Sequence, residues 1–116
     1  ISPLIQSQNT NYYHWWPKKN STEWIQYTFS EEKTISTSSV YWFDDGPWGG
    51  CRIPAGWKVL YLSGNEWLPV KTEQAPEILK DKLNTVSFVP VKTKAVRLEV
   101  TLPADNASGI YEWLVK

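Results

Sequence analysis

Hydrophobic and polar residues alternate along most of the chain, in short runs that are separated by turn residues. The clearest run is 96–101, where Val96, Leu98 and Val100 alternate with charged or polar neighbours. A period of two is typical of strands that bury one face. The same patterns predict strands at 23–29, 34–43, 57–61, 66–70, 86–88, 96–101 and 110–115.

The segments between these runs carry turn chemistry. Ser63, Gly64 and Asn65 separate two of the runs and therefore predict a hairpin. Only residues 74–84 have helical spacing, and because this segment is short and contains Pro76, we expect two helical turns at most. Seven or eight short strands joined by turns predict an all-β sandwich or barrel.

The chain has 116 residues, which suits one domain with one core. It shows no internal repeat, so we expect a single domain over 1–116, with 1–10 as a partial or irregular lead-in. The start at Ile1 does not resemble a signal peptide, and we expect the domain to be excised from a longer protein.

Charge and cysteine content narrow the possible partners. Twelve basic and twelve acidic residues give a formal net charge of zero, and the basic residues are scattered, so we expect no nucleic-acid partner. No apolar run approaches the roughly 20 residues that span a bilayer, so we expect no membrane partner. Cys51 is the only cysteine, which excludes an internal disulfide and is typical of a small buried apolar residue.

Tryptophan is the unusual component, with eight residues against three phenylalanines and no methionine. A domain this small rarely needs so many large amphipathic rings for its core alone. Five lie on predicted strands or at the hairpin, where we expect packing in the core or between strands: Trp24, Trp42, Trp57, Trp67 and Trp113. The other three lie in stretches rich in turn residues and are candidates for exposure: Trp15, Trp16 and Trp48.

Four segments carry strand motifs in a characteristic order. Residues 24–29 form an alternating strand led by tryptophan, and 57–67 form a strand, a turn and a tryptophan. Residues 84–88 and 95–98 follow as a strand pair, and 108–113 as a closing strand. In this order they resemble the discoidin-like (coagulation factor type C, galactose-binding-like) superfamily, which includes the family 32 carbohydrate-binding modules. The resemblance implies an eight-stranded antiparallel jelly-roll β-sandwich.

A second set of motifs consists of residues 14–17, 22–24, 41–45 and 49–52. It is similar to the sandwich domains appended to bacterial glycosidases of the β-L-arabinofuranosidase type. This resemblance implies a non-catalytic domain on a carbohydrate-active enzyme, in an extracellular or periplasmic location. The catalytic residues of such enzymes lie in a separate helical barrel domain.

Many members of the superfamily hold a structural calcium between an acidic N-terminal loop and a glutamate near the C-terminus. Glu112 stands at the matching position of the closing strand, and its carboxylate suits calcium, but the acidic loop is shortened or missing. The resemblance leaves two roles for Glu112, a calcium ligand or an ordinary residue at the strand end. It implies no other cofactor.

The residue pattern offers no catalytic constellation. Glycoside hydrolysis needs two carboxyl groups about 5–10 Å apart. Asp44 and Asp45 are adjacent, and on extended backbone they would point to opposite faces. The sequence also lacks a nucleophile elbow, a cluster of metal ligands and a phosphate-binding loop. We therefore expect a domain that is not an enzyme.

Sugar recognition combines flat ring faces with directional polar groups. Trp48, together with Trp15 or Trp16, is the predicted aromatic platform. The predicted polar groups beside it are His14, Asp44, Asp45 and Arg52. The alternatives are that the rings cap an open end of the sandwich, that the two aspartates cap a turn or pair with the arginine, and that the histidine is an ordinary hydrogen-bonding residue.

These features predict a non-catalytic carbohydrate-binding module that holds a parent glycosidase near a glycan, with galactosides or arabinosides as the ligand classes. The alternative is a structural accessory domain whose loop tryptophans pack on the parent catalytic domain in cis, without binding sugar. Tryptophan, tyrosine and arginine are favoured in protein interfaces too, so composition does not separate the two functions.

Overall fold

Two long strands organise the fold. A computed structural model describes residues 13–116, and that part of the chain contains strands but no helix. The strands are β1 (Tyr13–His14), β2 (Thr22–Phe43), β3 (Gly56–Ser63), β4 (Glu66–Pro69), β5 (Leu83–Thr101) and β6 (Gly109–Val115).

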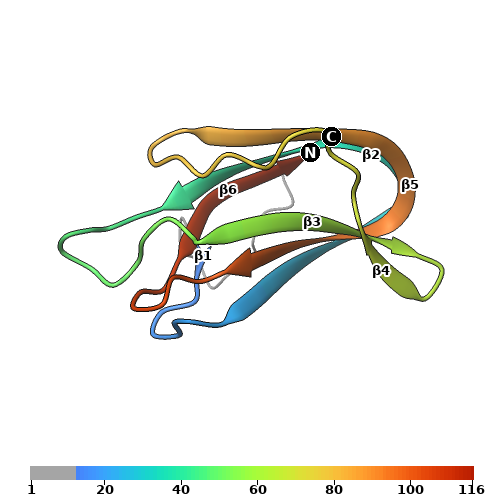
Figure 1. Cartoon of the computed structure of the whole chain (residues 1–116). Coiled ribbons are helices and arrows are strands. Elements are labelled where there is room, and N and C mark those ends of the chain that lie inside the picture. Colours follow the sequence, from blue (N-terminus) through green and yellow to red (C-terminus); the bar gives the residue numbers. More distant parts are fainter. Residues whose placement is uncertain (1–12) are drawn as a thin grey trace.

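The strands form one antiparallel sheet that folds back on itself. Their order is β1-β6-β2-β5-β3-β4, and β2 pairs with β5 along most of its length. Register shifts interrupt this pairing between Thr28 and Lys33 and again between Ile35 and Thr37. Such irregularities bend a strand pair and increase its twist. Figure 1 shows the result: β2 and β5 curve together, so that β6 lies in one layer and β3 in the other.

The core lies between these two layers. The alternation within β5 places Val96, Leu98 and Val100 on the inner face, where all three are fully buried. Trp42 of β2 meets Trp57 of β3 edge to face, with ring centroids 5.8 Å apart. Because these two strands belong to different layers in this part of the molecule, the ring pair links the layers.

The predicted all-β sandwich is confirmed, whereas the predicted eight strands are not. The described residues form six strands, because two pairs of predicted runs are continuous. Residues 23–29 and 34–43 both belong to β2, and residues 86–88 and 96–101 both belong to β5. The predicted hairpin joins β3 to β4, and its Gly64 has a φ of 62°, a conformation that glycine adopts without a side-chain clash.

The expected helical turns in residues 74–84 are wrong, because this segment is irregular up to the start of β5. Asn84 is fully buried. Its side chain bonds backbone groups of this segment that would bond other backbone groups in a helix. Its Oδ1 accepts from the Leu79 N–H at 2.7 Å, and its Nδ2 donates to the Leu79 carbonyl at 2.9 Å. Trp57 Nε1 donates to the Glu77 carbonyl at 2.8 Å. These bonds hold the irregular segment along the sandwich.

Two expectations concern the ends of the chain and the membrane. The predicted lead-in at residues 1–10 lies outside the described residues. Within residues 13–116, no helix is long and apolar enough to cross a bilayer.

Candidate functional site

Among the residues whose burial the structure describes, the most exposed aromatic ring is Trp48, on the connection between β2 and β3. Its side chain is 93% exposed. We call residues 44–52 the Trp48 loop. Two backbone bonds close it, from the Asp45 N–H to the Cys51 carbonyl at 3.1 Å and from the Gly49 N–H to the Asp45 carbonyl at 2.8 Å. The ring therefore projects from a closed turn.

Asp45 points its carboxylate into the Trp48 loop. Its Oδ1 accepts a hydrogen bond from the Cys51 N–H at 2.8 Å. The carboxylate also lies against Gly49, where any side chain would collide with it. Asp45 thus holds the two sides of the loop together, and only glycine at position 49 allows this close approach.

Asp44 caps the start of the loop. Its Oδ1 accepts from the Gly46 N–H at 3.0 Å, and its Oδ2 accepts from the Ile53 N–H at 3.1 Å. The Lys80 ammonium lies 3.6 Å from Oδ1, and the Asp44 side chain is only 8% exposed. Both oxygens are therefore used within the fold, which corresponds to the turn-capping role that the sequence left open.

Arg52 braces the loop from the other end. Its Nη1 donates to the carbonyls of Gly49 and Cys51, at 2.7 and 2.8 Å, and lies 3.8 Å from Asp45 Oδ1. The guanidinium covers Gly46, whose added Cβ would stand 2.6 Å from Arg52 Cζ. The two aspartates and this arginine together form the frame on which the Trp48 ring is presented.

Cys51 anchors the loop in a small apolar cluster with Phe43 and Ala107. Backbone bonds from the Ala107 N–H to the Gly50 carbonyl and from the Arg52 N–H to the Ala107 carbonyl tie the loop to the segment before β6. Burial, and secondarily the Asp45 carboxylate, raise the pKa of the Cys51 thiol to about 11. The thiol is therefore protonated at neutral pH, which does not suit a nucleophile.

Trp15 and Trp16 face opposite ways. Trp15 is 6% exposed and belongs to the core, and its backbone N–H donates to the Ser108 carbonyl at 3.0 Å. Trp15 is thus not part of an exposed platform, which corrects the prediction that it lines the binding surface. Trp16 is 59% exposed and its indole lies against Gly50 of the Trp48 loop.

Of the predicted site residues, the structure brings Trp16 together with the Trp48 loop. His14 is exposed on β1, opposite Gly109 of β6 in the strand register. Trp16 and Trp48 are both exposed, and the polar side chains of the Trp48 loop are largely engaged in its own hydrogen bonds. An exposed indole face suits a shallow contact with a flat, partly apolar ligand.

Glu112, the residue predicted as a calcium ligand or an ordinary strand-end residue, lies on the outer surface of the sheet. It is exposed on β6, opposite Tyr41 of β2. Within residues 13–116, no group of three or more histidine, cysteine or acidic side chains is placed to hold a metal ion. Glu112 has the surroundings of a strand surface residue.

The five tryptophans on strands divide in a way that sequence reasoning missed. Trp42, Trp57 and Trp113 are buried, and Trp67 is partly buried. Trp24 is packed between strands, as predicted, but it is 50% exposed and stacks on the Arg97 guanidinium, 3.9 Å from the ring centroid. The alternation of β2 is the sequence feature that could have shown this: Trp24 lies on the exposed face of the strand, and the neighbouring Ile25 lies on the more buried face.

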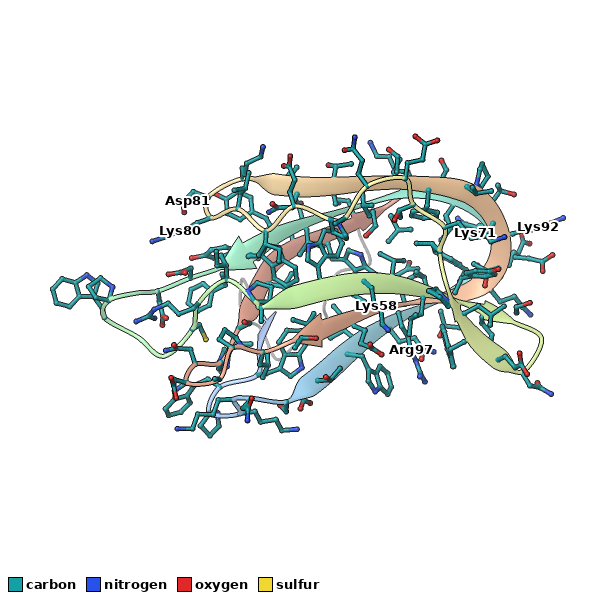
Figure 2. All side chains as sticks on the ribbon, viewed as in Figure 1. Lys58, Lys71, Lys80, Asp81, Lys92 and Arg97 are labelled. Atoms are coloured by element: carbon teal, nitrogen blue, oxygen red, sulfur yellow. The ribbon has the colours of Figure 1, made fainter. Side chains whose placement is uncertain are left out.

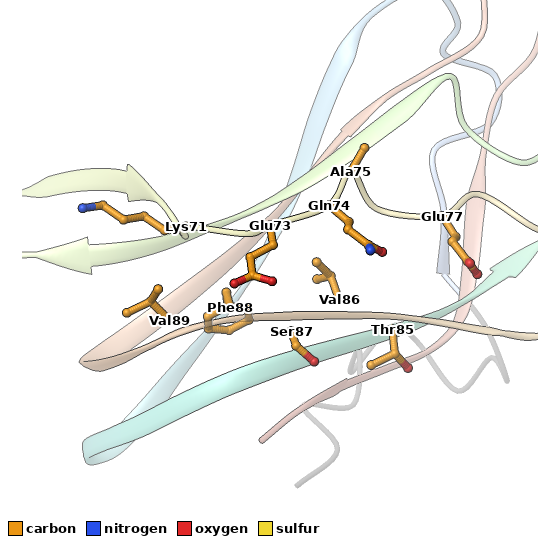
Figure 3. A pocket seen from close by; sticks show the side chains of 10 residues that line it. All are labelled: Lys71, Glu73, Gln74, Ala75, Glu77, Thr85, Val86, Ser87, Phe88 and Val89. Carbon is orange, nitrogen blue, oxygen red and sulfur yellow. The ribbon is translucent and has the colours of Figure 1, made fainter.

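A pocket of about 480 Å³ lies between residues 71–77 and the first half of β5. Figure 3 shows Glu73, Gln74 and Glu77 on one side of it and Thr85 and Ser87 on the other. Its lining contains no residue of the Trp48 loop, and its one aromatic ring, Phe88, is buried. The Trp48 loop is therefore the stronger candidate for a stacking contact.

Known structures share this fold at low sequence identity. A structure of the Streptococcus pneumoniae beta-galactosidase BgaA has a TM-score of 0.75 and 18% identity, over 98% of this chain and 84% of that chain. Chitosan-binding module 1 of a chitosanase/glucanase from Paenibacillus sp. IK-5 has a TM-score of 0.66 and 14% identity, over 96% and 80%. A putative alpha-L-fucosidase from Bacteroides thetaiotaomicron has a TM-score of 0.61 and 19% identity, over 81% of this chain and 19% of that chain.

The family relationship is visible in the sequence as well as in the fold. The model of the F5/8 type C domain family matches residues 4–113, which is nearly the whole chain. This match confirms the predicted discoidin-like relationship. The chain belongs to the F5/8 type C domain family.

Proposed function

We propose that this domain is a non-catalytic carbohydrate-binding module whose contact surface is formed by Trp48 and Trp16. The observation that carries the proposal is the 93% exposed Trp48 ring on a loop braced by its own side chains. A rigid loop holds the ring ready, so little conformational entropy is lost when a ligand stacks on it. The core does not use this ring, which leaves recognition as its role.

The proposed contact is a pyranose or furanose ring lying with its C–H face on an indole. Hydroxyl groups at the ring edge would then meet polar groups of the loop, and His14 of β1 is the further polar contact that we propose. A shallow contact of this size buries little surface, so we expect single-site affinities on the order of micromolar to millimolar. Galactosides and arabinosides are the proposed ligand classes.

The relatives support a role in carbohydrate binding. One structural neighbour is named a chitosan-binding module, and two others belong to a beta-galactosidase and a putative fucosidase. We infer that the domain belongs to a secreted or periplasmic glycoside hydrolase and raises the effective concentration of its catalytic domain near a glycan. The module itself would supply no reacting group.

The second candidate is a structural accessory domain. The matching fucosidase chain is far longer than this domain, which covers 19% of it, so such folds occur inside larger enzymes. In that setting the Trp48 ring would fill a pocket on the catalytic domain in cis. An exposed tryptophan can anchor a protein interface as readily as a sugar.

The test is calorimetry and tryptophan fluorescence of the domain against galactosides, arabinosides and chito-oligosaccharides. The proposal predicts binding by the wild type and a loss of roughly tenfold or more for Trp48→Ala, because a stacked ring contributes about 1–2 kcal/mol. Val89→Ala is the matched control, since Val89 is also an exposed apolar residue but lies outside the Trp48 loop. Silence across the panel, or a Trp48→Ala variant that binds like wild type, would leave the accessory-domain function.

A further inference from the structure

A second exposed cluster lies on the outer face of the layer that holds β3 and β4. The Arg97 guanidinium stacks on two rings, 3.9 Å from the centroid of Trp24 and 4.1 Å from that of Trp67. Its Nε donates to Gln26 Oε1 at 2.9 Å. We call these four residues the Arg97 face. Figure 2 labels Arg97 on β5 beside Lys58 of β3, whose ammonium lies 3.3 Å from Glu99 Oε1.

Strand parity builds this face. Gln26 lies opposite Arg97 in the pairing of β2 with β5, while the neighbouring Val96 and Leu98 point into the core. The hairpin brings Trp67 of β4 to the same side, opposite Leu62 of β3. Side chains from three strands therefore converge on one guanidinium that belongs to a well-paired strand.

The outer face of the other layer carries both polar and aromatic side chains. There, Ser39 and Thr85 share a hydrogen bond of 2.7 Å between their hydroxyl groups, across β2 and β5. Tyr111 is 47% exposed and meets Tyr41 edge to face, with ring centroids 5.7 Å apart. The Arg97 face differs in that its half-exposed ring, Trp24, is stacked on a cation.

The donors of Arg97 are only partly used. A guanidinium has five N–H donors in one plane, and the two faces of that plane are free for stacking. Among residues 13–116, no side chain or carbonyl accepts a hydrogen bond from the two terminal nitrogens of Arg97, and no carboxylate pairs with them. Arg52, by contrast, uses Nη1 for two carbonyls. The stacked rings fix the plane of Arg97 while its terminal donors are left for a ligand.

We propose that the Arg97 face binds an acidic sugar, a uronate unit within a glycan. Its carboxylate would accept the paired terminal N–H groups of Arg97, and its ring would lie on the open face of Trp24. A planar fork matches a carboxylate in two parallel hydrogen bonds, and a cation without an acidic partner complements its charge. This site is separate from the Trp48 loop and does not depend on sugar binding there.

The size of the face favours a sugar over a protein partner. One half-exposed indole beside one guanidinium offers a contact for a single pyranose. A stable protein interface needs about 800 Å² from each partner, which exceeds what these side chains expose. The competing occupant is a carboxylate on a protein surface, and the experiment distinguishes it from a uronate.

The experiment is calorimetric titration of the domain with oligogalacturonate, alongside its methyl ester and a neutral galacto-oligosaccharide. The acid should bind, and the ester should bind roughly tenfold or more weakly, because it lacks the charge that strengthens the hydrogen bonds. Binding of the acid should weaken as salt rises. In NMR spectra, the acid should shift the indole N–H signals of Trp24 and Trp67.

Variants locate the site. Arg97→Gln and Trp24→Ala should each lower the affinity for the acid roughly tenfold, and Arg97→Lys should fall between Arg97→Gln and wild type because it keeps the charge but not the fork. Lys82→Gln is the matched control, since it removes an exposed cation that already has an acidic partner and lies outside the Arg97 face. Near-ultraviolet circular dichroism confirms that each variant is folded.

Three results would overturn the proposal. The first is equal affinity for the acid and its ester, and the second is acid binding that survives Arg97→Gln. The third is no binding by the wild type at millimolar oligogalacturonate, which leaves a protein carboxylate as the occupant. Trp48→Ala separates the two sites, because it should weaken neutral-sugar binding roughly tenfold or more and leave uronate binding unchanged. Failure of one function is thus distinguishable from failure of the other.

Discussion

At the scale of single residues, hydrogen bonds decide which side chains of the Trp48 loop are left for a ligand. Both oxygens of Asp44 accept backbone N–H groups, and Arg52 Nη1 donates to two carbonyls. Their removal would therefore change the shape of the loop as well as its polarity. Trp48 itself has no packing role, so its replacement is the cleaner test of recognition.

The ionisation of the Cys51 thiol makes the stability of the domain depend on pH. Its pKa of about 11 in the folded state exceeds the ordinary value of 9.0, mainly because of burial. The folded protein therefore keeps the proton to higher pH than the unfolded chain does. Below pH 9 this stabilisation is complete, and it is lost between pH 9 and 11, by up to about 3 kcal/mol.

Urea unfolding of wild type and Cys51→Ala at pH 8, 9, 10 and 11 measures this effect. Other groups titrate in this range, so the quantity that matters is the difference between the two proteins. We expect the stability of wild type to fall more steeply than that of the variant. Parallel pH profiles would show that the thiol ionises equally in both states.

Residue roles were predictable from sequence where the local pattern was decisive. Pro47 and Gly49 around Trp48 indicated an exposed ring, and the ring is exposed. The sequence around the adjacent Trp15 and Trp16 gave no such signal. Both residues lie in a stretch held by backbone hydrogen bonds, where the Trp15 ring points into the core and the Trp16 ring toward solvent. The stack of Trp24 on Arg97 joins residues 73 positions apart, and only the pairing of β2 with β5 reveals it.

At the scale of elements, alternation located the strands but not their continuity. Residues 30–33 carry polar and charged side chains and therefore look like a turn between two strands. In the structure β2 runs through them, because a register shift lets the strand pair bend without ending. Helical spacing misled at residues 74–84, where the long-range hydrogen bonds from Trp57 to the Glu77 carbonyl and from Asn84 to the Val40 carbonyl outweigh local propensity.

The prediction at this scale concerns Asn84, because its side chain holds the segment before β5 in place. Its side chain bonds the N–H and carbonyl of Leu79 and the carbonyls of Val40 and Lys82. Asn84→Ala leaves these buried groups without partners and should lower the free energy of unfolding by about 2–3 kcal/mol. Denaturant unfolding measures the loss, and hydrogen exchange should show that Leu79 loses protection.

Asn84→Asp is the companion variant. It keeps the oxygen that accepts from the Leu79 N–H and exchanges the donor nitrogen for a second oxygen. A carboxylate facing three carbonyls is unfavourable, so this nearly isosteric change should cost at least as much stability as alanine at neutral pH. A loss below about 0.5 kcal/mol for both variants would show that the clamp does not hold the segment.

At the scale of the whole molecule, the continuity of β2 and β5 affects how the domain unfolds. Because β2 and β5 each pass through both layers, neither layer can separate while these strands remain paired. The Trp42–Trp57 contact joins the layers across the core, and Trp113 Nε1 donates to Ser38 Oγ at 2.9 Å within one of them. The sandwich is therefore one cooperative unit rather than two stacked sheets.

We accordingly expect a single unfolding transition. Far-ultraviolet circular dichroism and tryptophan fluorescence should give the same denaturant midpoint. In native-state hydrogen exchange, the amides of Val40 in one layer and Val59 in the other should open with the same free energy, since both report global unfolding. Trp57→Phe, which removes the indole facing Trp42, should shift both amides together and by the same amount. If only the Val59 amide responded, the layer with β3 would unfold on its own, and the bent pair of β2 and β5 would be a hinge rather than a common core.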